Sequence, residues 1–129
     1  MSWRPQISET SNLQILTAIL AAITGFIHFY LAPQIGLNTL GISFAFAGLG
    51  FTVLIISIIY NYRLKLAYLL AIPFTVGQIL IWYYMNRPSL EFLIRGEPVL
   101  DALDKLAQML LIFLLSYLYF SEGDIESER

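Results

Sequence analysis

The sequence contains no cysteine, a single histidine and few charged residues. Without cysteine, the chain has no disulfides, thiolate metal sites or cysteine nucleophiles. Seven Lys and Arg against nine Asp and Glu give a formal net charge of -2, which does not suit a nucleic-acid-binding surface. One histidine cannot supply two axial haem ligands, and zinc would lack its usual nitrogen and sulfur ligands. Neither cofactor therefore has a self-sufficient site.

Apolar residues, in contrast, make up 58% of the 129 residues, and only 12% are charged. They are concentrated in four long runs, at residues 13–31, 40–60, 66–85 and 99–120. A helix rises about 1.5 Å per residue, so about 20 apolar residues cross the hydrocarbon core of a bilayer. The runs predict an all-α, four-helix transmembrane bundle that forms one integral membrane domain over residues 1–129.

The polar segments beside these runs have predicted structures of their own. Pro88 and Gly96 enclose residues 89–95, which are expected to form a short interfacial helix between the third and fourth spans. Residues 121–129 are rich in acidic side chains and predict a disordered, solvated tail.

Lysine and arginine positions indicate an orientation in the cell membrane. With the amino end inside, the cytoplasmic side carries Arg4, Arg63, Lys65 and Arg129, and the opposite side carries Arg87, Arg95 and Lys105. Because Lys and Arg are enriched in cytoplasmic loops, the count predicts, by a narrow margin, that both termini are cytoplasmic.

The second run carries a stripe of small residues on one helix face, formed by Gly41, Ala45, Gly48 and Thr52. Small residues let two helices approach closely in a membrane. The stripe predicts either packing against another helix of the same chain or a homodimer through this face.

Polar residues inside the spans fall in a single leaflet. They are His28 in the first span, Gln78 and Trp82 in the third, and Asp104, Lys105 and Gln108 in the fourth. Polar groups left unpaired in hydrocarbon are costly, so these side chains are expected to meet. One interpretation is a polar pocket that binds a lipid head group, a quinone or a related amphipathic molecule, or relays protons. The other is hydrogen bonding that holds the helices together.

No glycine-rich phosphate loop and no nucleophile with an evident base partner stand out, so catalysis by this chain alone is not expected. The leading hypothesis is a noncatalytic accessory or scaffolding component of a membrane assembly, with lipids and a membrane protein or a second copy as partners. The alternative is a quinone- or lipid-binding protein or redox-associated subunit that uses the polar pocket. A third is a small transporter or channel, which would need several copies to enclose a pathway.

Three segments carry a resemblance to known proteins: residues 24–33 (TGFIHFYLAP), 72–83 (IPFTVGQILIWY) and 103–108 (LDKLAQ). They resemble recurring segments of small four-span archaeal membrane proteins of uncharacterised function. This resemblance covers nearly the whole chain and implies a topology but no activity. In size and span count the chain is also similar, more distantly, to DoxX-like membrane proteins, some of which are associated with respiratory oxidases. That second resemblance implies a quinone as a ligand.

Overall fold

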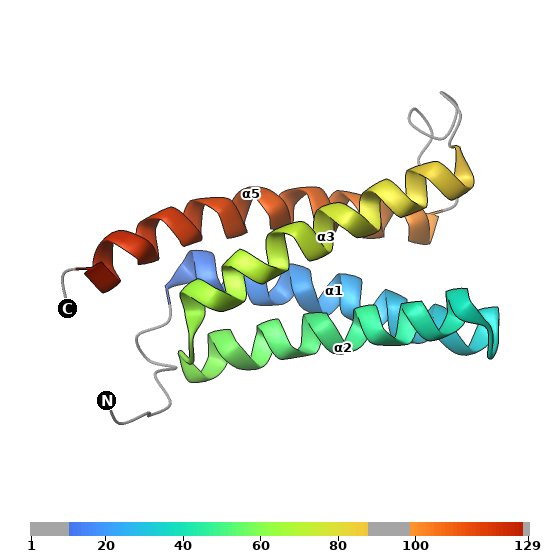
Figure 1. The fold of residues 1–129 in the computed structure, drawn as a ribbon, viewed down its shortest axis with the longest axis horizontal. Helices are drawn as coiled ribbons and strands as arrows, with labels where there is room; N and C mark the ends of the chain where they lie inside the picture. The colour runs from blue at the N-terminus through green and yellow to red at the C-terminus, as the bar shows by residue number, and fades with distance from the viewer. Residues whose placement is uncertain (1–10, 88–98, 128–129) are drawn as a thin grey trace.

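A computed structural model describes residues 11–87 and 99–127, and the regular structure in this part of the chain is α-helical (Figure 1). Its elements are α1 (Asn12–Ile35), α2 (Thr39–Tyr60), α3 (Leu64–Asn86) and α5 (Val99–Ser127). Helix α1 contacts α2 and α5, and α3 contacts α5 and α2, so the helices form an elongated bundle. The all-α class is confirmed, and each predicted run lies within one helix.

Local sequence explains where the helices begin and end. The Ser11 Oγ accepts a hydrogen bond from the Gln14 backbone N–H at 3.1 Å, and the Gln14 side chain accepts from the Ser11 N–H at 2.9 Å. This capping box satisfies two donors that a helix start leaves free. At the other end, Gly36 adopts a φ of 106°, which a residue with a side chain rarely tolerates. We call the end where α1 begins and α5 ends the near end, and the end where α1 and α3 end the far end.

Helices α1 and α2 approach each other closely at glycines. Gly41 and Gly48 are both buried, while Ala45 and Thr52 of the same stripe are half-buried. A Cβ added at Gly41 would overlap the carbonyl oxygen of Gly36, and one at Gly48 would lie 2.8 Å from the Phe29 ring. In this structure the glycines of the stripe therefore serve a contact within the chain.

The near half of the bundle has an apolar centre. Phe51, Tyr68, Leu111 and Leu115 are almost fully buried there, and they join α2, α3 and α5. The Gln14 Nε2 donates to the Tyr68 hydroxyl at 2.9 Å, which links α1 to α3. Charged side chains are absent from this described part of the core, so cohesion here comes from packing.

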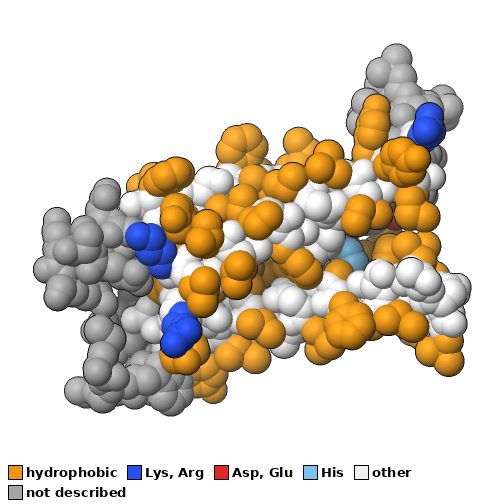
Figure 2. All heavy atoms as spheres, viewed as in Figure 1, with side chains coloured by type: hydrophobic (Ala, Val, Ile, Leu, Met, Phe, Trp, Pro, Cys, Tyr) orange, Lys and Arg blue, Asp and Glu red, His pale blue; other side chains and the backbone are white. Residues whose placement is uncertain are grey.

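The outside of the bundle is apolar along its length, as Figure 2 shows for one face. Three helices of the described residues are long and apolar enough to cross a membrane: Asn12–Ile35, Thr39–Tyr60 and Leu64–Met85. Helix α5 differs because Asp101, Asp104 and Lys105 lie in its first two turns. The coarse prediction of a helical, membrane-suited chain is therefore supported by three helices.

Two further predictions concern the segments beside the runs. Helix α5 continues to Ser127, so the predicted disorder is wrong for residues 121–127. Once a helix is nucleated, each added residue gains a backbone hydrogen bond, which lets α5 extend beyond its last apolar residue. Residues 128–129 and the interfacial helix predicted for residues 89–95 lie outside the described residues.

The glycine contact between α1 and α2 makes a prediction about stability. Gly41→Ala should lower the free energy of unfolding by about 1–3 kcal/mol, because the new methyl group meets rigid backbone. Gly77→Ala is the matched control, since a Cβ at Gly77 meets nothing within 4 Å and alanine favours the helix. Thermal unfolding in detergent micelles measures both. Equal melting temperatures for the two variants would contradict the tight contact.

Candidate functional site

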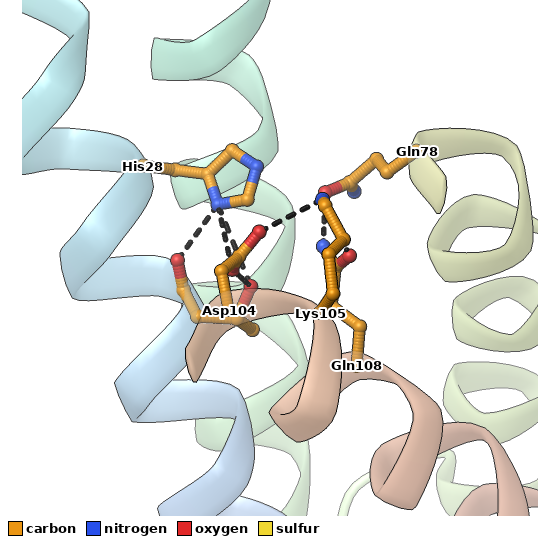
Figure 3. A network of polar contacts seen from close by, with 6 residues as sticks. His28, Gln78, Asp104, Lys105 and Gln108 are labelled. Carbon is orange, nitrogen blue, oxygen red and sulfur yellow. Dashed lines mark hydrogen bonds and ion pairs between the residues drawn. The ribbon is translucent and has the colours of Figure 1, made fainter. Parts of the chain in front are cut away.

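Polar side chains from three helices meet in the far half of the bundle (Figure 3). We call them the polar network, and its members are Thr24, His28, Gln78, Asp104, Lys105 and Gln108. Trp82 lies beside it, against Lys105. All six residues of the predicted pocket are thus brought to one place, together with Thr24.

Helical spacing explains how the network assembles. On each contributing helix, two side chains of the site are four residues apart: Thr24 and His28 on α1, Gln78 and the neighbouring Trp82 on α3, and Asp104 and Gln108 on α5, where Lys105 is a third. Residues at i and i+4 lie on the same face of a helix, so each pair points in one direction. Where three such faces converge, the bundle acquires a polar interior.

The centre of the network is an ion pair between Asp104 and Lys105. The Lys105 Nζ donates to Asp104 Oδ2 at 2.9 Å, and Asp104 is only 5% exposed. On its other side, Asp104 Oδ1 accepts a hydrogen bond from the Thr24 hydroxyl. The ammonium lies 5.3 Å from the centroid of the Trp82 ring, whose face attracts cations. The two buried charges therefore neutralise each other within the bundle.

His28 closes one end of the network. Its Nδ1 lies 2.7 Å from the Thr24 carbonyl oxygen and 3.7 Å from Asp104 Oδ1. A carbonyl oxygen can only accept, so Nδ1 carries a hydrogen and donates it. The ring lies 4.9 Å from the Phe44 ring and 6.0 Å from the Phe51 ring, centroid to centroid. The Nε2 is on the edge that points away from Asp104 in Figure 3.

At the opposite end, the network has a fixed direction. Lys105 has donors only, so Gln108 must accept its hydrogen bond through Oε1, at 2.9 Å. The Gln108 amide nitrogen is then left to donate, and it does so to Gln78 Oε1 at 2.9 Å. This bond also fixes the Gln78 amide: its Oε1 accepts from Gln108, so its Nε2 points away from Gln108.

The last donor in this sequence of hydrogen bonds is the amide nitrogen of Gln78. Gln78 Nε2 is buried and meets no acceptor among the residues that the structure describes. A buried donor left unpaired costs about 1–3 kcal/mol. An acceptor supplied from outside the described chain would recover that free energy.

Sequence reasoning missed the aromatic surroundings of the site. Phe44 and Phe51 of α2 pack against the His28 ring, although α2 gives no member to the polar network. The sequence could have indicated Thr24, because it lies one helical turn before His28. It does not indicate which aromatic rings lie near His28, because the runs are uniformly apolar. Within the described residues, no group of three or more His, Asp or Glu side chains is placed to hold a metal ion.

The ion pair makes a testable prediction. Lys105→Met should lower the free energy of unfolding by about 3–5 kcal/mol, because it leaves the Asp104 carboxylate buried without its cation. The double variant Asp104→Asn, Lys105→Met should lose less, since it buries no unpaired charge. Lys65→Met is the control: this exposed cation lies 5.6 Å from the Tyr119 ring centroid and forms no part of the ion pair, so its loss should cost no more than about 1 kcal/mol. A double variant less stable than Lys105→Met, in detergent unfolding, would contradict this account.

Comparison with known proteins gives a family but no activity. No curated protein and no solved structure matches the chain. A family model described as a family of unknown function (DUF7475) matches residues 4–119, which is most of the sequence and includes the whole polar network. The expectation of an uncharacterised family is confirmed, and the chain belongs to the DUF7475 family of unknown function.

Proposed function

We propose that this protein is a noncatalytic, four-span membrane protein that binds a membrane-soluble molecule at its polar network. The observation that carries the proposal is the buried Nε2 of Gln78, which has no acceptor in the described chain. A ligand with a carbonyl, ester or phosphate oxygen supplies one. Such oxygens occur on quinones and on lipid head groups and their ester linkages.

The exposed face of α5 supports its assignment as the fourth span. Mean hydropathy counts every side chain, whereas the bilayer contacts only those that face outward. The charged Asp104 and Lys105 face the bundle interior and are bound there. Over residues 103–121, where the side chains of α5 are described, its large exposed side chains are apolar or aromatic: Leu103, Leu106, Met109, Leu110, Phe113, Tyr117 and Phe120.

The burial of Lys105 also supports the proposed orientation. Its side chain is 12% exposed and bound to Asp104, so it does not act as a loop charge. Without it, the far side of the membrane has Arg87 and Arg95, against four Lys and Arg on the near side. Because the near end holds the start of α1 and the end of α5, both termini are assigned to the cytoplasm (Figure 1).

This topology predicts the behaviour of reporter fusions. A reporter joined after Arg129 should score as cytoplasmic, and one inserted after Arg87 should score as extracytoplasmic. If α5 did not cross the membrane, both reporters would give the extracytoplasmic signal. If the orientation were reversed, the two signals would be exchanged. An alkaline phosphatase and green fluorescent protein pair measures both positions.

A second candidate function follows from the ion pair itself. Asp104 and Lys105 bond each other and other side chains of this chain, so the network could serve only to hold the helices together and make the bundle rigid. The protein would then act as an accessory or scaffolding component of a membrane assembly, and its contacts would be with other proteins. The finer resemblances, to archaeal four-span proteins and to DoxX-like proteins, belong with these proposals. The ligand experiment below separates the two functions.

Removing the unpaired donor tests ligand binding directly. Gln78→Met keeps the length of the side chain and removes its amide, so it should abolish binding of the native ligand. Because it also removes the oxygen that accepts from the buried Gln108 Nε2, it should lower the free energy of unfolding by about 1–3 kcal/mol, which thermal unfolding measures separately. Gln34→Met is the matched control, because the Gln34 amide is exposed and donates only to the Tyr30 carbonyl. Native mass spectrometry of protein gently extracted from its own membrane detects bound molecules.

The outcomes of this experiment are distinct. A stoichiometric ligand in the parent protein and in Gln34→Met, but not in Gln78→Met, supports the binding function. A ligand that stays in Gln78→Met contradicts it. An empty site with a stable protein partner, in all three forms, also contradicts it and supports the accessory function.

A further inference from the structure

We infer that the ligand is a flat ring with carbonyl oxygens and one long apolar tail, of the quinone class, and that it enters from the bilayer between α2 and α3. This inference rests on the proposed function, because it takes the Gln78 Nε2 as the group that the ligand binds. It adds a route, a chemical class and a place for the tail.

The route is the space between α2 and α3 in the far half of the bundle. In Figure 1 the two helices meet at their short connection and diverge toward the far end. Figure 2 shows the pale blue surface of the chain's one histidine, His28, in a hollow between them. His28 is only 4% exposed, so the space between α2 and α3 brings the bilayer close to the network without opening it fully.

Gly77 borders this opening. It precedes Gln78 and lies on the side of α3 that turns toward α2, almost one turn beyond Phe74. A Cβ added at Gly77 meets nothing within 4 Å, although the residue is only half-exposed. In a helix interior, alanine stabilises the helix by about 1 kcal/mol relative to glycine. The glycine thus leaves room next to the unpaired amide at a cost in helix stability.

Aromatic rings line the hollow and favour a flat ligand. Phe44 and Phe51 pack on the His28 ring, and Phe51 contacts Phe74 edge to face, with 5.4 Å between centroids. Flat rings pack well against such side chains in stacked or edge-to-face geometry. A carbonyl oxygen on the ring would accept from Gln78 Nε2, and an oxygen on its other side would face His28.

A groove for the tail begins on the near side of Phe74, whose partly exposed ring reaches α2 at Gly50, so the tail passes over this ring. Between α2 and α3, an apolar groove of about 260 Å³ is bounded by Phe51 and Phe74 at its far end and runs toward the near end. Its remaining lining residues are Gly50, Val53, Leu54, Ala67, Leu70 and Ala71. A second apolar hollow, of about 480 Å³, lies between α1 and α5 and includes no residue of α3, which carries Gln78. A ligand that reaches Gln78 from between α2 and α3 therefore meets one groove for a tail, which suits a single-tailed quinone better than a two-tailed phospholipid.

The first experiment compares Gly77→Phe with Gly77→Ala in purified, full-length protein in detergent micelles. The probes are decylubiquinone, which has a ring and one tail, and dioleoyl phosphatidylglycerol, which has ester oxygens and two tails. Gly77→Phe should weaken decylubiquinone binding at least about tenfold, because the ring fills the entrance. Gly77→Ala should bind it like the parent protein. Equal affinities for Gly77→Phe and the parent protein would overturn the route.

A second variant tests the tail groove and does not depend on Gly77→Phe folding. Val53 is 62% exposed on the rim of the groove, so Val53→Trp can cover the groove without disturbing the core. It should weaken decylubiquinone binding at least about tenfold and leave the tail-less ubiquinone-0 unaffected. Equal weakening of both quinones, or of neither, would overturn the assignment of the tail.

The same measurements separate this inference from the proposed function. If phosphatidylglycerol binds the parent protein, loses binding in Gln78→Met, and decylubiquinone does not bind at all, the binding function stands and the quinone class is overturned. If Gln78→Met abolishes decylubiquinone binding while Gly77→Phe retains it, the route between α2 and α3 is overturned alone. If Gln78→Met binds both probes normally, the inference and the proposed function fall together. If neither probe binds the parent protein, the quinone class is overturned, and the native mass spectrometry decides the proposed function.

Discussion

The ion pair between Asp104 and Lys105 sets the arrangement of the far half of this bundle. Charges enclosed in a bundle need partners, and here the carboxylate accepts from Thr24 of α1 while the ammonium donates to Gln108 and lies over the Trp82 face. Because the ammonium can only donate, it orients the Gln108 amide, and that amide orients Gln78. The direction of a single donor thus determines which atom of another helix remains unsatisfied.

The two halves of the bundle are held together by different physics. Toward the near end, cohesion comes from apolar packing around Phe51, Tyr68 and Leu111, whereas at the far end α1 meets α2 through the backbone at Gly41. Toward the far end, α1, α3 and α5 share hydrogen bonds from which α2 is absent. Helix α2 therefore packs along α1 and separates from α3 toward the far end. The gap that forms between α2 and α3 is a result of this unequal bonding.

Much of the fold follows from the sequence, because apolar runs of about 20 residues leave few alternatives to long helices. The shared depth of His28, Gln78 and Asp104 also follows, since helical rise converts sequence position into height. Three other features depend on geometry that no run of residues reveals. The direction of the Gln108 amide depends on Lys105, which can only donate. The open space at Gly77 depends on how far α2 lies from α3 at this point. The continuation of α5 to Ser127 depends on backbone hydrogen bonding. Hydropathy also averages over the whole circumference of α5, and so it understates how apolar the exposed face is.

The adjacency of Asp104 and Lys105 in the chain has a consequence for the biogenesis of the protein. Neighbouring side chains on a helix diverge, but the long lysine stem curls back to reach the carboxylate at 2.9 Å. Each charge alone would cost about 2.5–3.5 kcal/mol on entering the bilayer centre by insertion scales. As a pair on one helix, they neutralise each other without a charge from another helix. For the proposed fourth span, α5 would thus carry its own counter-ion, and its insertion would not have to wait for the rest of the bundle to assemble.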